Sequence, residues 1–418
     1  MSARETAGRP HSARAYYGDS YTSQFEAEVV DVTQVDGRPA AILARTYFFP
    51  TSGGQPHDVG TLGEAAVAEV VERDVDGAIL HVLDRPLASG RYPAAIDWAR
   101  RFDHMQQHTA QHLLSQAFVE HLGAATVGFH LGAETSTIDL AASAVAPDQA
   151  AAVEDRVNDL VEANAPVVCF EVAPEAAVSV GLRKPSDRTG PIRVVDIAGG
   201  FDRSACGGTH VARTGELGLV KIRRWERRGP ETRVEFVAGR RARLDYRWKN
   251  EAVVRLANAL SIKDVELADT VLRLVEEGRE RQRELHALRN RLLDHEADAL
   301  WRAAELQPLA GGLTARLVVA SFDGRTFEEL RYLAGKVAER GAAVALLGLR
   351  TSDRGQIAFA RSADVALDVG RLLRAALAPA GGRGGGRPES AQGGVPDPAA
   401  VEPALAAARS IAAGGDSG

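Results

Sequence analysis

Two short motifs that lie far apart in the sequence restrict how this chain can fold, because their side chains are suited to bind one metal ion. In HTAQH (residues 108–112) the two histidines are four residues apart, a spacing that places both on one face of a helix. In CGGTH (residues 206–210) a cysteine and a histidine flank two glycines, which allow the tight turn that brings them together. Three nitrogen donors and one sulfur favour zinc. The sequence therefore predicts one tetrahedral zinc site with the ligands His108, His112, Cys206 and His210.

The residues alone leave the role of this zinc ion open. Four protein ligands are typical of a closed, structural site, in which the metal would only join the helix to the later loop. A metallopeptidase is disfavoured, because its HExxH motif needs a glutamate after the first histidine and Thr109 stands there. His104, one helical turn before His108, fits either a hydrogen-bond partner of a ligand or an ordinary helix-surface residue.

The hydrophobic pattern predicts an α+β fold, since strands and helices follow one another without regular alternation. Short strands separated by turn residues predict a small β-barrel-like domain near the N-terminus. The expected parts are an N-terminal extension (1–23), the β-barrel-like domain with a Gly-Gly-Gln loop (24–100), an α+β zinc-containing core (101–240), a long helical arm (241–308) and a small C-terminal α/β domain (309–418).

The arm carries an apolar repeat with spacings of three and four, and the repeat is interrupted by residues that do not fit it. Its members include Val271, Leu274, Leu285, Leu288 and Leu292. The pattern is consistent with an imperfect coiled coil, and with a homodimer formed through the arm or the C-terminal domain.

Composition restricts the location of the protein more than its function. Two cysteines cannot form a disulfide framework, which favours a reducing compartment. The first residues show no apolar segment typical of a signal peptide, and no run approaches the roughly 18 to 20 apolar residues that span a membrane. We therefore expect a cytoplasmic protein with no membrane partner.

One basic segment differs from the average charge of the chain. The net charge of -6 does not indicate a nucleic-acid partner, but residues 221–249 contain eleven Lys or Arg against four Asp or Glu. Four aromatic residues are interleaved with them. Such a patch can follow phosphates while its rings stack on exposed bases, and Arg223 and Arg224 are candidates for RNA contact. A solvated basic helix face fits the same composition.

Four segments resemble the editing part and the C-terminal domain of alanyl-tRNA synthetases, in the same order along the chain. HTAQH and SACGGTHV (residues 204–211) are similar to the two metal-binding motifs of the synthetase editing domain, which occur in variant form in a threonyl-tRNA synthetase domain. FFPTSGGQPHDVGTL (residues 48–62) resembles the Gly-Gly-Gln loop that precedes that core. GGRGGGRPESAQGG (residues 381–394) resembles the C-terminal RNA-binding domain shared with alanyl-tRNA synthetases and DHH-type phosphoesterases.

The resemblance implies a function as well as a fold. The editing-like sequence begins within about 25 residues of Met1, with no class II catalytic domain before it. The chain therefore resembles a free-standing alanyl-tRNA editing protein of the long AlaX type, which cannot aminoacylate. Such a protein is a zinc-dependent, trans-acting deacylase, not a ligase, and removes serine or glycine from mischarged alanine tRNA. The alternative is a tRNA-binding protein with a purely structural zinc site. A DHH-type phosphoesterase would need an aspartate-rich metal centre, which the sequence does not show.

The resemblance also implies further site residues. Gln55 is the candidate for orienting substrate or water, with Gly53 and Gly54 allowing close backbone approach, although a simple turn fits the same loop. The expected tRNA contacts are Arg383, Gly384, Gly385, Gly386, Arg387, Arg223 and Arg224. Without the resemblance, the glycine-rich segment would be interpreted as a flexible linker. Zinc could activate water, polarise the ester or bind the substrate amine, and the sequence does not decide among these roles.

Overall fold

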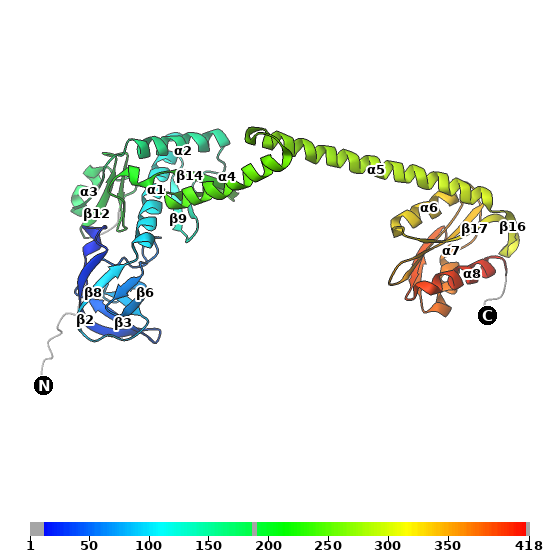
Figure 1. Cartoon of the computed structure of the whole chain (residues 1–418), viewed down its shortest axis with the longest axis horizontal. Coiled ribbons are helices and arrows are strands. Elements are labelled where there is room, and N and C mark those ends of the chain that lie inside the picture. Colours follow the sequence, from blue (N-terminus) through cyan, green and yellow to red (C-terminus); the bar gives the residue numbers. More distant parts are fainter. Residues whose placement is uncertain (1–11, 186–189, 415–418) are drawn as a thin grey trace. The chain divides into compact units, whose positions relative to one another are not determined.

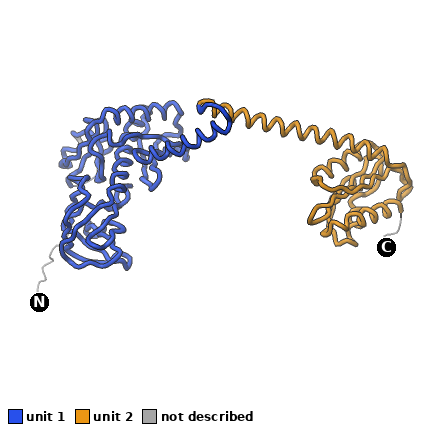
Figure 2. Tube along the Cα trace, viewed as in Figure 1, with its two compact units in different colours: residues 1–264 blue, residues 265–418 orange. Residues whose placement is uncertain are grey.

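The computed structural model describes residues 12–185 and 190–414. The chain divides into two compact units, residues 1–264 and residues 265–418, and each is described by itself (Figure 2). Residues 1–11 of the expected N-terminal extension lie outside the described residues. Both units contain helices and strands, so the predicted α+β class is confirmed.

A closed six-stranded barrel forms the first part of unit 1, as the short strands predict (Figure 1). Its strand order is β2-β3-β7-β6-β5-β8. The strands are β2 (Gln24–Val35), β3 (Arg38–Leu43), β5 (Gly60–Leu62), β6 (Ala65–Glu72), β7 (Ile79–Leu83) and β8 (Gly90–Ile96). Asp36 and Gly37 have φ angles of 49° and 77°, the left-handed geometry that a two-residue turn between β2 and β3 requires.

The residues immediately before the barrel are packed onto it. β1 (Ala13–Arg14) pairs in parallel with β4 (Arg45–Thr46), and a 3-10 turn follows at Ala15–Tyr17. Within that turn Tyr16 is only 1% exposed. The described end of the expected extension is therefore an integral part of unit 1.

A long buried helix, α1 (Trp98–Leu122), is the centre of the second part of unit 1. It begins at Asp97, whose carboxylate accepts a hydrogen bond from the backbone N–H of Arg100, and ends at Gly123 in the left-handed conformation. Helix α2 (Pro147–Glu162) and strands from two sheets pack against it. The first sheet has the order β14 (Val220–Arg228), β15 (Glu231–Ala238), β10 (Ser136–Leu140) and β9 (Thr126–Leu131). The second has the order β11 (Val167–Val172), β12 (Ile192–Ile197) and β13 (Asp202–Ala205), and a short helix, α3 (Pro174–Val180), follows β11. Because these elements close around α1, its polar side chains are buried together with its apolar ones.

The expected helical arm consists of two helices that belong to different units. α4 (Arg240–Leu260) belongs to unit 1 and ends at Ser261, which has a φ of 56°, whereas α5 (Leu267–Ala303) belongs to unit 2. Leu285 and Leu292 of the apolar repeat are 56% and 68% exposed. The coiled coil and the homodimer stay predictions. Among the described residues, no helix has both the length and the apolar character needed to cross a membrane.

Unit 2 is a six-stranded sheet with helices on both faces. Its order is β16 (Leu306–Leu309), β17 (Leu313–Asp323), β18 (Ala343–Arg350), β19 (Gly355–Arg361), β21 (Ser390–Val395) and β20 (Arg383–Gly386). Alternate side chains of β18 enter two separate cores. Leu347 packs with the end of α5 and with α6 (Phe327–Glu339), whereas Leu346 packs with α7 (Val369–Leu377) and α8 (Val401–Ala412).

The glycine-rich segment forms two strands of this sheet, so the interpretation as a flexible linker is wrong. β20 and β21 pair antiparallel at one edge of the sheet, with Gly384 opposite Gly393. A Cβ atom at Gly384 would stand 2.8 Å from the carbonyl oxygen of Gln392 and 2.9 Å from a methyl group of Leu373 on α7. Close packing of the hairpin against its neighbours therefore requires glycine at this position.

Candidate metal centre

The four predicted ligands come together in unit 1. His108 and His112 lie one turn apart on α1, and Cys206 and His210 belong to the loop that follows β13. Their ligand atoms all lie within 4.8 Å of one another, and the sulfur of Cys206 is 3.5 Å from Nε2 of His108 and 3.4 Å from Nε2 of His210. Tetrahedral ligands at about 2.0–2.3 Å from a zinc ion stand roughly 3.5 Å apart, so this cluster could hold such an ion.

Each histidine of the cluster is held by a contact of its other ring nitrogen, Nδ1. The contacts are His108 with Oε1 of Gln55 at 2.8 Å, His112 with Oδ2 of Asp202 at 2.7 Å, and His210 with Oγ1 of Thr109 at 3.1 Å. Because Nδ1 is engaged in each ring, Nε2 is the nitrogen available to a metal. Partners of this kind fix the orientation of a metal-binding imidazole and raise its basicity.

The charges in the cluster also suit a metal ligand set. Burial lowers the pKa of His112, but the hydrogen bonds and charges of Asp202 and Cys206 together outweigh burial and raise this pKa to about 9. Burial raises the pKa of the Cys206 thiol, but His108 and His210 beside it hold that pKa well below its usual range. A lowered pKa favours the thiolate of Cys206, which is the form in which cysteine binds metals.

The loop that carries Cys206 lies directly against α1, which explains its second glycine. A Cβ atom at Gly208 would stand 2.2 Å from Cε1 of His108 and 2.8 Å from Oε1 of Gln55. Arg193 on β12, only 6% exposed, donates hydrogen bonds of 2.8 and 2.9 Å to the carbonyls of Cys206 and Gly208. The loop is thus fixed from two sides, by packing on α1 and by this guanidinium.

The Gly-Gly-Gln loop of the barrel reaches the cluster through Gln55. Gly53 and Gly54 have φ angles of 54° and 81°, so the chain turns through the left-handed region that favours glycine. Gln55 is completely buried; its amide oxygen accepts from the N–H of Thr209 at 3.0 Å, and its amide nitrogen donates to the Thr209 hydroxyl at 2.8 Å. Together with the contact to His108, these bonds place Gln55 behind a ligand, whereas Gly53 lies on the wall of the neighbouring cavity.

A buried ion pair joins the same loop to α1. The side chains of Arg101 and Asp58 are both 0% exposed, and Nε of Arg101 is 3.0 Å from each carboxylate oxygen. Asp58 also accepts from the N–H of Phe49 at 2.6 Å, and Arg101 donates to the carbonyl of Ser20 at 2.9 Å. The pair therefore connects the barrel loop and the segment before the barrel to the helix that carries two of the ligands.

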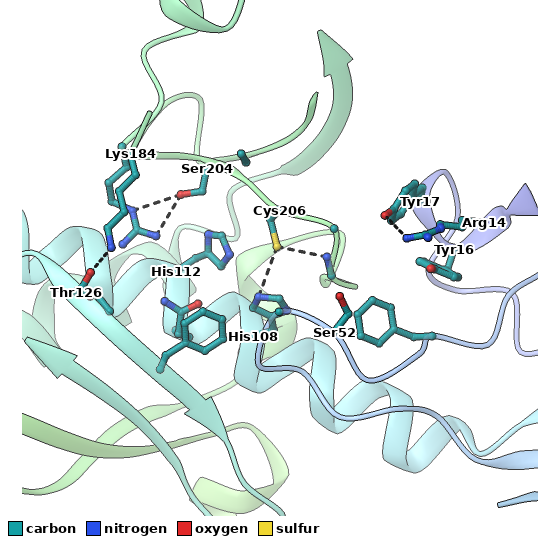
Figure 3. Close-up of a pocket in the computed structure, with 18 of the residues that line it drawn as sticks. Arg14, Tyr16, Tyr17, Ser52, His108, His112, Thr126, Lys184, Ser204 and Cys206 are labelled. Atoms are coloured by element: carbon teal, nitrogen blue, oxygen red, sulfur yellow. Dashed lines mark hydrogen bonds between the residues drawn. The ribbon is translucent and has the colours of Figure 1, made fainter. Parts of the chain in front are cut away.

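The cluster opens onto a cavity of about 940 Å³ (Figure 3). His108, His112 and Cys206 all line this cavity. The remaining ligand, His210, is 3% exposed and does not line it. A molecule in the cavity would therefore contact the side of the cluster that His108, His112 and Cys206 form. The fourth candidate ligand, His210, lies behind them.

Sequence reasoning missed two walls of this cavity. Arg14, Tyr16 and Tyr17, from the segment before the barrel, line one end, and Lys184 lines the other (Figure 3). Arg183, the neighbour of Lys184 in the chain, also lines the cavity. The adjacent tyrosines are a weak local signal for the first wall, because a paired aromatic sequence is unusual in a solvated extension. The sequence around residues 183–184 has no feature that predicts its approach to the cluster.

His104 is not the partner of a ligand that its helical spacing allows. Its side chain is 2% exposed, and its Nδ1 has no hydrogen-bond partner among the described residues. Burial lowers the pKa of His104 to about 3, so the ring is neutral. Gln55 instead makes the contact to His108.

The basic segment on β14, β15 and α4 is partly neutralised within the protein. Arg223 forms ion pairs with Glu235 at 3.0 Å and with Asp245 at 3.2 Å, and Arg224 pairs with Glu235 at 2.9 Å. The side chain of Arg224 is nevertheless 76% exposed, against 29% for Arg223. Of the two predicted RNA contacts, Arg224 is the more accessible to a phosphate.

Two of the four aromatic residues of this segment belong to the core. Phe236 is fully buried, and the ring N–H of Trp225 donates a 2.9 Å hydrogen bond to the carbonyl of Val145. Tyr246 and Trp248 on α4 are 65% and 54% exposed. Among the four, only Tyr246 and Trp248 are open to stacking on a base.

The contacts predicted in unit 2 lie on β20 and directly after it. Arg383 and Arg387 are exposed, and each lines a shallow groove, of about 680 and 810 Å³. A Cβ atom at Gly386 would stand 2.3 Å from the carbonyl oxygen of Ser390, whereas one at Gly385 would meet open space. The role of these residues in tRNA binding stays a prediction.

Two family models match parts of the chain. The threonyl and alanyl tRNA synthetase second additional domain matches residues 192–234, and the DHHA1 domain matches residues 314–414. The first match contains Cys206 and His210, and the second covers most of the sheet of unit 2.

Relatives named alanine–tRNA ligase match along most of the chain. The ligase of Methanoregula boonei is 32% identical, and the match covers 94% of this chain and 43% of that ligase. The ligase of Acidothermus cellulolyticus is 33% identical, and the match covers 97% of this chain and 48% of that ligase. The chain thus spans less than half of each of these ligases. A solved C-Ala domain of the Aquifex aeolicus alanyl-tRNA synthetase is 26% identical and covers 26% of this chain and 99% of that chain, with a TM-score of 0.24. The two matched domains and the ligase relatives support an alanyl-tRNA synthetase-like protein with an editing-type domain and a C-terminal DHHA1 domain, as the motifs predict.

Proposed function

We propose that this protein deacylates alanine tRNA that carries a wrong amino acid, serine or glycine, at a zinc site formed by His108, His112, Cys206 and His210. The relatives and the matched second additional domain support a role in alanyl-tRNA editing. The observation that carries the proposal is the position of the cluster, because three ligands line a cavity of about 940 Å³. A cavity of that volume can take an amino acid together with the nucleotide to which it is esterified.

The chain's own residues have two tasks in this reaction, to orient the ligands and to hold the ester beside them. When bound, zinc would supply a Lewis acid that can polarise a carbonyl or acidify a water molecule. Gln55 and Asp202 fix the imidazoles of His108 and His112 from behind. We assign Gln55 this positioning role rather than contact with substrate or water, because its amide is buried and bonded to protein on both of its ends.

The decisive experiment measures deacylation of seryl-, glycyl- and alanyl-tRNA by the purified, zinc-loaded chain. We expect serine or glycine to be released faster than alanine, and His108→Ala to abolish the reaction because it removes a metal ligand. His121→Ala, an exposed histidine in the last turn of the same helix, is the matched control and should keep the wild-type rate. Failure of the zinc-loaded wild-type chain to release any of the three amino acids would refute the proposal.

The alternative, tRNA binding with a purely structural zinc site, is favoured by the number of protein ligands, since four usually close the coordination shell. It predicts tight tRNA binding without turnover and a large fall in melting temperature on chelation. The two functions are distinguished by a His108→Ala protein that is folded and zinc-free. Unchanged deacylation by that protein would exclude a catalytic role for the metal.

A further inference from the structure

The cavity beside the four candidate ligands is lined by one lysine for which the described residues provide no carboxylate partner. Three cationic side chains line the cavity: Arg14, Arg183 and Lys184. Arg14 pairs with Glu72 at 2.5 Å, and Arg183 pairs with Asp202 at 2.8 Å. Within residues 12–185 and 190–414, no carboxylate forms an ion pair with Lys184. Among the three described cations of the lining, Lys184 is therefore the one best placed to pair with an anionic ligand.

Lys184 is held in position despite the absence of such a pair. Its ammonium donates a hydrogen bond to the backbone carbonyl of Thr126, at the end of the cavity seen in Figure 3. An ammonium has three N–H donors, so this contact leaves two for a ligand. Because a carbonyl oxygen carries no full charge, the contact anchors the side chain without neutralising it.

The position of Lys184 relative to the cluster is set by its neighbour in the chain. Arg183 and Nδ1 of His112 share the carboxylate of Asp202, at 2.8 and 2.7 Å. Figure 3 shows Lys184 on the His112 side of the cluster, away from Tyr17. A ligand whose reacting bond lies at the cluster can therefore reach Lys184 with a group that extends past His112.

The substrate class of the proposed function, on which this inference rests, has an anion at such a place. The ester to be broken is on the terminal ribose of tRNA, and the same ribose carries the phosphodiester that leads to the preceding nucleotide. That phosphodiester is the permanent anion closest to the ester. Lysine binds phosphate as a compact point charge. We propose that Lys184 binds the last phosphodiester of the aminoacyl-tRNA and thereby places the ester at the metal cluster.

The test changes one anion in the RNA and one cation in the protein. An acceptor-stem minihelix is made with either a normal phosphodiester or an uncharged methylphosphonate before its last nucleotide, and both RNAs are charged with serine. For the wild-type chain, kcat/KM should fall about tenfold with the methylphosphonate, as expected for the loss of one charge-assisted hydrogen bond. Lys184→Met should show a similar loss with the normal RNA and no further loss with the methylphosphonate. The slope of log KM against log salt concentration should fall by about one, as expected when one phosphate contact is lost.

Two further variants separate the effect of this charge from effects on folding. Lys184→Arg keeps the positive charge, so its kcat/KM should again be lower with the methylphosphonate RNA than with the normal RNA. Lys336→Met removes a lysine of α6 in unit 2, paired with Glu339 at 2.8 Å, and should behave as the wild type does. Equal cleavage of both RNAs by the wild type would overturn the inference, as would a Lys184→Met protein that still distinguishes them. If the zinc-loaded wild type cleaves neither RNA, the proposed function fails instead.

Discussion

Replacing Gly208 with alanine should disturb the metal cluster through a single methyl group. The added Cβ would stand 2.2 Å from Cε1 and 2.4 Å from Nδ1 of His108, and 2.8 Å from Oε1 of Gln55. Carbon atoms in contact are normally about 3.5–4.0 Å apart, so the imidazole or the loop must move by roughly 1 Å. Metal–ligand distances tolerate changes of only about 0.2 Å. We therefore expect the affinity for zinc to fall by at least about tenfold, the smaller effect known for disturbing a ligand's partner.

The measurement is a competition for zinc between the protein and a chromophoric chelator. Gly207→Ala is the matched control, because the atoms nearest to its Cβ belong to the Tyr17 side chain, with the hydroxyl oxygen at 3.2 Å, and this side chain can move at the cavity wall. Zinc affinity of Gly207→Ala should stay near that of the wild type. If Gly208→Ala binds zinc as tightly as the wild-type chain, the loop does not press on His108 and the reasoning is refuted.

Two other predictions concern the support of the cluster and the packing of unit 2. Asp202→Asn replaces the charged partner of one imidazole with a neutral amide, and zinc affinity measured by the same competition should fall about ten- to hundredfold; an unchanged affinity would mean that the carboxylate does not tune this ligand. Gly384→Ala should destabilise unit 2 by about 1–3 kcal/mol through overpacking, measured by urea unfolding. Gly385→Ala, with open space around its Cβ, should be nearly neutral, and equal effects of the two variants would contradict the packing argument.

The ligands of the cluster could be predicted because each motif is local. An i,i+4 histidine pair on a helix and a short glycine-containing loop each bring two donors together within a few residues. Metal chemistry then requires the two motifs to meet. The hydrogen-bond partners could not be predicted in the same way. Gln55 and Asp202 are 53 and 90 residues from the histidines that they hold, and their contacts depend on how the barrel and β13 pack on α1.

Burial accounts for most of what the sequence could not indicate. Phe236 and Trp225 lie within a segment rich in arginine, a composition that also suits a surface patch, yet both side chains pack in the core. The glycine-rich segment has the composition of a linker, but its glycines allow a hairpin to pack closely against α7. In each case the composition is compatible with two structures, and the side chains that pack against the segment from elsewhere in the chain decide between them.

The buried pair of Arg101 and Asp58 limits how this protein can be divided into modules. The change from strands to helix near residue 100 looks like a border at which a barrel could be exchanged or removed. The interior, however, is continuous across that border, because a cation on the helix side has its anion on the barrel side. A fragment that starts at α1 would lose the carboxylate of Asp58 and the carbonyls of Ser20 and Tyr47, which hold this guanidinium, and would expose the face of α1 that they cover. The barrel and the candidate metal centre are thus coupled in their folding. An exchange of this region between related proteins would therefore have to replace both together.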